Sequence, residues 1–227
     1  MNVTSSVCNP LKQLIPVSQD KLKNPQRADS GVDMQISAKE AKAKAFYTKE
    51  EEPWKAGTMH YSEEGVDQTR PITKDEYLDY MRTMSMIDIE VQQCQFDKFR
   101  NNLIAIRPDL AGINISYTLD SEAQIKILDP DQVFNGQQLE WLTDSLNTLK
   151  GFKETVQSHA KKMMALVDHD TETFGNRYVL NLNNFADTID YGKIISIKDQ
   201  HEMNNAWIKQ IHEKGERREG PVVDLRA

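Results

Sequence analysis

The feature that most constrains the fold is a long amphipathic stretch that begins at Thr73 and ends before Pro108. Thr73 and Glu76 have the spacing of a capping box, in which each side chain accepts a hydrogen bond from the other residue's backbone. Apolar side chains then recur mainly at steps of three and four residues: Tyr77, Met81, Met84, Ile87, Val91, Cys94, Phe99 and Leu103. Proline disfavours helical backbone in the preceding residue, so Arg107 is expected to end the helix. The stretch predicts one helix more than about 40 Å long, which needs a partner of similar length.

A second amphipathic stretch supplies that partner. Asn135 and Gln138 have the spacing of another capping pair. The apolar stripe that follows comprises Leu139, Leu142, Leu146, Leu149, Phe152, Val156, Ala160, Met163 and Val167. Gly151 lies within this pattern, and glycine costs about 1 kcal/mol relative to alanine inside a helix, so we expect a kink or a break there. We predict that the two long helices pack antiparallel.

The segment between the helices predicts a β-hairpin with one buried face. Its apolar residues alternate with polar ones on both sides of the turn 120–123: Ile113, Ile115, Tyr117, Leu119, Ile125 and Ile127. Residues 177–182 and 193–197 predict two later strands. Asp199 and Gly215 are expected to begin and end a closing helix, with Trp207 on its apolar face.

These elements predict an α+β domain. Two long antiparallel helices pack with a short antiparallel sheet, made from the hairpin and the later strands, and with a C-terminal helix. The domain is expected to span residues 73–214, and a charged tail occupies residues 215–227. Residues 1–72 lack a sustained apolar period and contain several proline breaks, so we expect a largely disordered extension. Within it, only residues 36–50 favour a brief helix, where Ser37 and Glu40 have capping-box spacing.

Composition narrows the class of partner. The net charge of −7 at pH 7 argues against a nucleic-acid partner, and no apolar run is long enough to span a membrane. Cys8 and Cys94 lie in dissimilar surroundings, so nothing in the sequence demands an oxidising compartment.

The composition of the N-terminal residues bears on whether the protein is exported. They lack the basic and apolar regions of a Sec signal peptide. The start is rich in Ser, Thr and Asn, and no acidic residue precedes Asp20. This composition resembles the export signals of bacterial proteins delivered by type III secretion machines. The resemblance implies secretion by a non-Sec route; the alternative is an ordinary terminus of a cytoplasmic protein.

The stretch DPDQVFNGQQLE, from Asp129 to Glu140, has the length of an EF-hand calcium loop. Such a loop requires an oxygen ligand at position five and glycine at position six. Val133 and Phe134 stand there instead. We therefore interpret the stretch as a turn, in which Val133 and Phe134 pack beneath the chain before Asn135 caps the next helix.

The strongest candidates for catalysis lie in VDHDTETFGNR. Asp168, His169 and Asp170 are adjacent, and Glu172 follows closely. Carboxylates and an imidazole are able to share a proton or bind a metal, so Asp168, Asp170 and Glu172 are the candidate metal ligands. A polar cluster at a helix end is more often a solvated exit loop. His159 is a further catalytic candidate, although its place beside the apolar stripe favours a packed histidine.

No intact catalytic motif accompanies these residues. His201 and Glu202 begin like the zinc-peptidase motif H-E-x-x-H, but Asn205 replaces the second histidine. We therefore favour a non-enzymatic protein-interaction module without a cofactor, namely a bacterial exported effector or secretion accessory protein. One alternative is a small metal-dependent hydrolase that uses residues 168–172. Another is a structural subunit that self-associates through the long helices, which a second exposed apolar stripe would favour.

Overall fold

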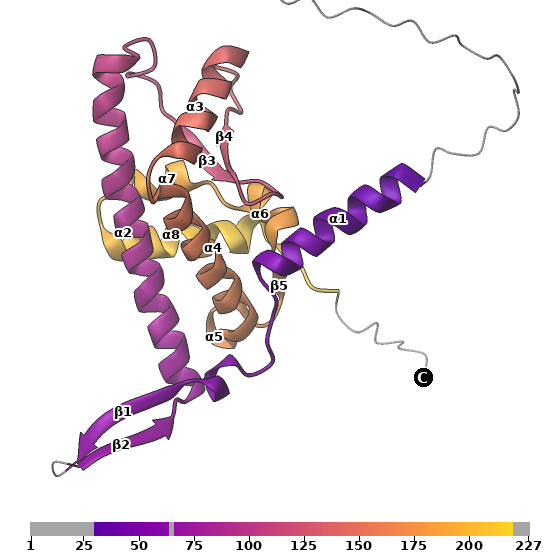
Figure 1. The fold of residues 1–227 in the computed structure, drawn as a ribbon, viewed down its shortest axis with the longest axis vertical. Coiled ribbons are helices and arrows are strands. Elements are labelled where there is room, and N and C mark those ends of the chain that lie inside the picture. Colours follow the sequence, from indigo (N-terminus) through magenta and orange to yellow (C-terminus); the bar gives the residue numbers. More distant parts are fainter. Residues whose placement is uncertain (1–29, 64–65, 220–227) are drawn as a thin grey trace, which may run out of the picture.

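The structure is a computed structural model that describes residues 30–63 and 66–219, with the backbone alone at residues 30–37, 61 and 66. It is an α+β fold (Figure 1). In chain order its elements are α1 (Ser30–Phe46), the 3-10 helix η1 (Pro53–Ala56), β1 (Thr58–Glu63), β2 (Val66–Pro71), α2 (Lys74–Ile106), β3 (Ser116–Leu119), β4 (Ile125–Leu128), α3 (Gly136–Thr148), α4 (Phe152–His169), α5 (Thr171–Phe174), β5 (Tyr178–Val179), α6 (Leu182–Thr188), α7 (Tyr191–Ile195), α8 (Gln200–Lys214) and β6 (Glu216–Arg217).

Helix α2 confirms the prediction of one long helix. It has 33 residues, and the capping box between Thr73 and Glu76 is formed in both directions. Its last turn closes with a hydrogen bond from Arg107 N to Leu103 O, directly before Pro108. Helix α2 packs antiparallel along α4 (Figure 1), so the two predicted long helices are partners.

The second long helix is broken where glycine interrupts its stripe. Gly151 has a φ of 77°, a left-handed conformation that side chains other than glycine rarely adopt. Helix α3 ends before this residue and α4 begins after it. Asn135 and Gln138 cap α3 as predicted. The result is a short helix that packs on β4 and a longer one that packs on α2.

The hairpin of β3 and β4 confirms the prediction from alternation. Tyr117 pairs with Ile127 and Leu119 with Ile125, and these four side chains are buried. The predicted single sheet is not observed. Within the described ranges the strands form three separate antiparallel pairs, β1 with β2, β3 with β4 and β5 with β6.

The strand predicted at residues 193–197 is wrong, because this segment forms α7 and the turn after it. Tyr191, Ile194 and Ile195 are all buried, and their spacing of three and four residues is helical. The alternation visible in residues 193–197 omits Tyr191, which supplies that spacing. Asp190 caps the helix by accepting a hydrogen bond from Lys193 N at 3.3 Å.

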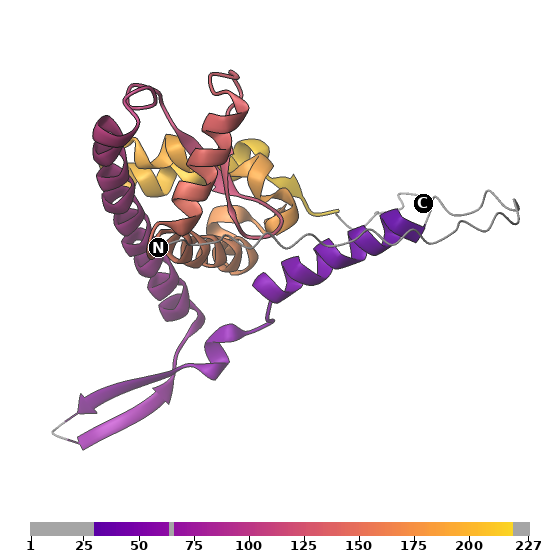
Figure 2. The same cartoon turned by 45° about the horizontal axis from the view of Figure 1, so that its top comes forward.

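The described part of the N-terminal region is more structured than we expected. Helix α1 begins at Ser30, before the predicted start at Ser37, and β1 and β2 form a second hairpin. Figure 2 shows α1 and this hairpin extending away from the rest of the fold. Residues 43–54 contact the core: Ala43 is buried, and Tyr47 and Trp54 pack against it. The expected disorder and export signal within residues 1–29 lie outside the described residues.

The tail predicted from residue 215 is partly structured as well. Glu216 and Arg217 form β6, which pairs with Val179 and Tyr178 of β5. The last eight residues of the predicted tail, 220–227, lie outside the described residues.

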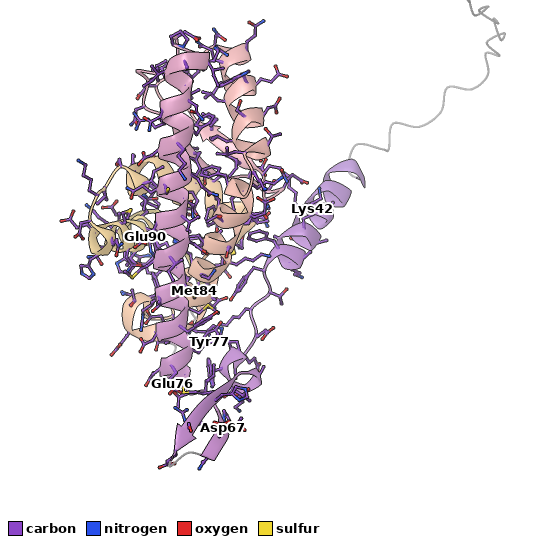
Figure 3. All side chains as sticks on the ribbon, turned by 60° about the vertical axis from the view of Figure 1, so that its left-hand side comes forward. Lys42, Asp67, Glu76, Tyr77, Met84 and Glu90 are labelled. Atoms are coloured by element: carbon purple, nitrogen blue, oxygen red, sulfur yellow. The ribbon has the colours of Figure 1, made fainter. Side chains whose placement is uncertain are left out.

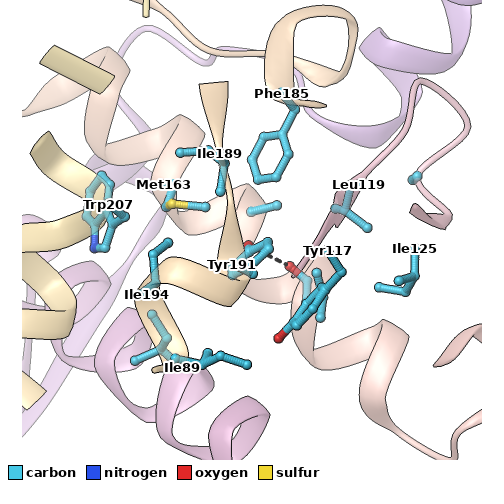
Figure 4. Close-up of a cluster of buried hydrophobic side chains, with 14 of the residues drawn as sticks. Ile89, Tyr117, Leu119, Ile125, Met163, Phe185, Ile189, Tyr191, Ile194 and Trp207 are labelled. Carbon is cyan, nitrogen blue, oxygen red and sulfur yellow. Dashed lines mark hydrogen bonds between the residues drawn. The ribbon is translucent and has the colours of Figure 1, made fainter. Parts of the chain in front are cut away.

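The core is formed mainly by aromatic and branched side chains between α2, α4, α7 and the β3–β4 hairpin. Figure 4 shows Tyr117 and Tyr191 in this cluster, where their rings stack with centroids 5.3 Å apart. Phe96 and Phe152 each lie within 5.2 Å of the Tyr117 ring, measured between centroids. The core therefore connects the long helices to the hairpin.

Helix α2 presents a different face to this core from the one its pattern predicts. Of the predicted stripe, Tyr77, Phe99 and Leu103 are buried, whereas Ile87 and Val91 are exposed. The buried positions include Ser85 and Gln92, which are fully enclosed. The interior face also includes Leu78, Ile89 and Phe96, which the predicted stripe omits. Because α2 carries apolar residues on two faces, the predicted stripe combined parts of both.

Candidate functional site

Asp168 lies in the last turn of α4 and contacts residues from both the N-terminal and the C-terminal segments of the described chain. Its Oδ2 accepts a hydrogen bond from Tyr47 Oη at 2.9 Å, and its Oδ1 pairs with Arg218. Lys49 Nζ lies 3.9 Å from Oδ1. We call residues 46–53 the strap, because they cross from α1 to η1 over the end of α4 and contact it through Tyr47. Asp168 therefore joins the strap to the segment after β6.

His169 is buried beneath the strap side of the fold. Its ring meets Trp54 edge-on at 5.6 Å and Tyr77 at 6.3 Å, measured between ring centroids. Burial lowers the pKa of His169, although the neighbouring Asp168 carboxylate opposes this. The neutral imidazole acts here as a packing group between aromatic rings.

Asp170 begins α5 and is bound on both oxygens. Its Oδ1 accepts a hydrogen bond from Thr173 N at 3.1 Å, and its Oδ2 accepts bonds from Thr173 Oγ1 and Arg82 Nη2 at 2.7 and 2.9 Å. Burial alone would raise the pKa of Asp170, but the hydrogen bonds from Thr173 and Arg82 lower it. Asp170 is therefore a capping carboxylate that ties α5 to α2.

The structure does not gather the predicted site residues around one point. Asp168 and Asp170 bind different cations, and Glu172 is exposed on α5. Throughout residues 30–63 and 66–219, as far as side chains are described, no three His, Cys, Asp or Glu residues are grouped to hold a metal ion. The metal-dependent hydrolase remains a hypothesis that these contacts do not favour.

His159 belongs to the core and not to the cluster at the end of α4. Its Nδ1 lies 3.0 Å from Tyr191 Oη, and its Nε2 has no hydrogen-bond partner among the described residues. Burial, assisted by the nearby Lys162 ammonium, lowers the pKa of His159 to about 3. It is a neutral histidine held inside the protein.

The stretch from Asp129 to Glu140 is a turn that leads into the first residues of α3. Asp129 accepts hydrogen bonds from Val133 N and Phe134 N at 2.9 and 3.1 Å, so its carboxylate closes the turn. Phe134 is buried beneath it as predicted, whereas Val133 is exposed.

A pocket of about 540 Å³ lies between the strap, α2 and α4. Aromatic side chains (Phe46, Tyr47, Tyr77 and Tyr80) share its lining with polar and charged ones, among them Glu50 and Lys161. A concave, mostly apolar pocket with a few polar groups is the usual form of a binding site. No sequence pattern indicated this pocket, because one wall comes from the strap, in a region for which we expected at most a brief helix.

A row of apolar side chains on the outside of α2 begins at this pocket. Tyr80, Ile87 and Val91 are 58%, 45% and 40% exposed. Met84 is half-buried and Cys94 is exposed, and both lie on the same side of the helix. We call these five residues the α2 stripe. Figure 3 looks toward this side of the molecule and labels Met84 and Glu90 on α2.

Comparison of the chain with family models, curated proteins and solved structures gives no match. In addition, none of the helices described is both long and apolar enough to cross a membrane. The features that bear on function are the α2 stripe, the pocket and the contacts of the cluster at the end of α4.

Proposed function

We propose that the protein is a non-enzymatic interaction module that binds a protein partner on the α2 stripe. The observation that carries this proposal is the exposure of Tyr80, Ile87 and Val91 on one side of a rigid helix that spans the fold. Single exposed apolar residues are normal, but a continuous row of them is typical of an interaction surface.

The composition of α2 supports the proposal. The helix buries Ser85 and Gln92 against the core while Ile87 and Val91 face outward. Ser85 Oγ and Gln92 Nε2 have no hydrogen-bond partner among the described residues. Burial of unpaired polar groups destabilises a fold, so the outward apolar residues are hard to explain by the stability of this chain alone.

The pocket beside Tyr80 supports the same surface. Tyr80 belongs to both the pocket lining and the α2 stripe, so the apolar surface continues from a ridge into a hollow. Interfaces usually concentrate their binding free energy where a large side chain enters such a hollow.

The spacing of the α2 stripe favours a second candidate function, a structural subunit that self-associates through this helix. Steps of four and three residues are the spacing of a coiled-coil seam. In that case the partner is another copy of the chain, and the mass of the protein in solution should depend on its concentration.

Export by a non-Sec route also belongs to this proposal. It rests on the composition of the first twenty residues, which resemble type III export signals. An exported effector or secretion accessory protein acts by binding other proteins, which agrees with an interaction surface in place of a catalytic one.

The experiment is a comparison of two variants in the native cell, each tagged at the C-terminus. Ile87→Asp puts a charge on the α2 stripe. Ile104→Asp makes the same change at another exposed isoleucine of α2 that lies off the stripe. Cells and medium are separated before purification. A stoichiometric partner that is retained by wild type and by Ile104→Asp, but lost from Ile87→Asp, supports the proposal. Equal retention by both variants contradicts it.

A further inference from the structure

We infer that the partner binds the α2 stripe through an amphipathic helix that carries basic residues along one of its edges. This inference rests on the proposed function and adds the chemistry of the partner. It is carried by the spacing of the α2 stripe and by the charges that border it on each side.

The spacing selects a helix. The α2 stripe runs through Tyr80, Met84, Ile87, Val91 and Cys94, with successive steps of four, three, four and three residues. The mean step of 3.5 residues keeps an apolar seam in contact with a second helix that coils around the first. Lys98 and Asn101 continue the spacing with polar side chains, so the seam ends at Cys94. From Tyr80 to Cys94 the seam is roughly 21 Å long, enough for about four turns of a partner helix.

One border of the seam is acidic. Thr83, Glu90 and Asp97 are one heptad apart and line the same side of the α2 stripe. The carboxylates of Glu90 and Asp97 form no ion pair or hydrogen bond with any residue that the structure describes, in contrast to that of Asp79, which pairs with Arg82 at 2.8 Å. Two carboxylates along this border are thus open to a cation from outside.

The other border requires no such partner. Met81, Asp88 and Gln95 line it at the same spacing. Asp88 is already paired with Lys162 of α4 at 2.7 Å. Only the border with Glu90 and Asp97 therefore needs cations from a partner. Lysine or arginine on the facing edge of the partner helix supplies them.

A second copy of the chain fits this border poorly. In an antiparallel pair of α2 helices the rows of Thr83, Glu90 and Asp97 face each other, so carboxylates meet carboxylates. In a parallel pair these positions face Asp88, Gln95 and Asn102 of the other copy. Neither arrangement supplies a cation on this edge, and each copy carries a net charge of −7. Charge complementarity thus favours a different, basic helix.

The test uses the full chain and two synthetic helical peptides of 21 residues, a length roughly equal to three heptads. Both peptides have leucine and isoleucine at the seam positions. One peptide has lysine, and the other has glutamate, along the single edge that faces Glu90 and Asp97. Binding is measured by fluorescence anisotropy of labelled peptide, and circular dichroism checks the folding of every variant. Ile104 continues the row of Thr83, Glu90 and Asp97, so we expect the lysine peptide to bind Ile104→Asp at least as tightly as wild type, and to bind Ile87→Asp about tenfold more weakly or worse. The two variants add the same charge, so simple attraction between opposite charges predicts equal or tighter binding to both.

Reversal of the acidic border tests the charge requirement directly. The double variant Glu90→Lys with Asp97→Lys should prefer the glutamate peptide, whereas wild type prefers the lysine peptide. A second measurement avoids substitutions in the seam: attachment of a bulky maleimide to Cys94, in a Cys8→Ser chain, should block the lysine peptide.

The possible failures have different meanings. Suppose that the two peptides bind with equal affinity to wild type and to the reversed variant, and that Ile87→Asp weakens both by the same factor in either background. The seam then binds helices without regard to charge, so the inference is overturned and the proposed function stands. If sedimentation shows a wild-type dimer that Ile87→Asp dissolves, the occupant is a second copy and the inference is again overturned. If neither peptide depends on Ile87 or Cys94, the inference and the proposed function fall together.

Discussion

The buried His159 predicts a specific loss of stability in mild acid. Its imidazole is fully enclosed and lies 3.0 Å from the hydroxyl of Tyr191, with Lys162 and the edge of Trp207 nearby. The folded protein holds the pKa of His159 at about 3, whereas an unfolded histidine has a pKa of about 6.5. Between these values only the unfolded chain binds the proton. Stability is therefore complete above about pH 6.5 and is lost as the pH falls toward about 3.

The magnitude follows from the two pKa values. One pKa unit corresponds to about 1.4 kcal/mol, so the full difference corresponds to about 5 kcal/mol below pH 3. Between pH 7 and pH 5 the unfolded imidazole becomes almost fully protonated, and the free energy of unfolding should fall by about 2 kcal/mol. Domains of this size are commonly stable by about 5 to 15 kcal/mol, so the change is large enough to measure.

The assay is urea unfolding of wild type and His159→Gln, followed by tryptophan fluorescence at several values between pH 5 and pH 7. Glutamine does not titrate and keeps a polar group near Tyr191. The other titratable groups, His169 among them, are present in both proteins, so their contributions to the pH dependence cancel in the comparison. Wild type should lose about 2 kcal/mol more than the variant between pH 7 and pH 5. Parallel pH profiles for the two proteins would refute the assignment of this loss to His159.

Two further predictions concern packing. Gly192→Ala should lower the free energy of unfolding by several kcal/mol, roughly the penalty of an overpacked core, because an added Cβ would lie 2.7 Å from Ser116 Cα. The matched control is Gly112→Ala, since nothing lies within 4 Å of a Cβ added there. Similar melting temperatures for the two variants would contradict the reasoning. Tyr47→Phe removes the hydrogen bond to Asp168 and should cost about 1 kcal/mol, with faster tryptic cleavage of the strap; an unchanged cleavage rate would show that this bond does not hold the strap.

The bounds of α2 were predictable because local chemistry determines them. Thr73 and Glu76 cap the first turn with each other, and Pro108 prevents the helix from continuing past Arg107. The face that α2 buries was not predictable in the same way. It depends on what α4 and the hairpin offer, and the true interior face contains Ser85 and Gln92. The buried face also carries Leu78, Ile89 and Phe96, so α2 has two apolar faces and the pattern alone does not select between them.

The contacts of the cluster at the end of α4 were beyond the reach of sequence reasoning. The adjacent carboxylates Asp168 and Asp170 were visible as candidates, but their roles depend on Tyr47, Arg82 and Arg218. Tyr47 lies in the brief helix predicted within the N-terminal extension, and Arg218 lies in the predicted tail, so neither was expected to contact α4. Long-range pairs of this kind leave no local signal, so a structural clasp and a catalytic cluster look alike in the sequence.

The contacts of Asp168 also determine how the fold responds to a pulling force. Tyr47 and Lys49 reach this carboxylate from the segment before β1, and Arg218 reaches it from the segment after β6. Tension at the N-terminal end acts first on α1, where Ala43 is buried and Lys42 pairs with Glu122, and then on the contacts of Tyr47 and Lys49 with Asp168. Tension at the C-terminal end acts first on Arg218 and then on the β5–β6 pair. Both sets of contacts come before the long interface of α2 with α4. The end segments should peel off first and leave the core folded. A narrow pore that pulls on one end of the chain would then unfold the end segment at low force, and would meet the main mechanical resistance only at the core.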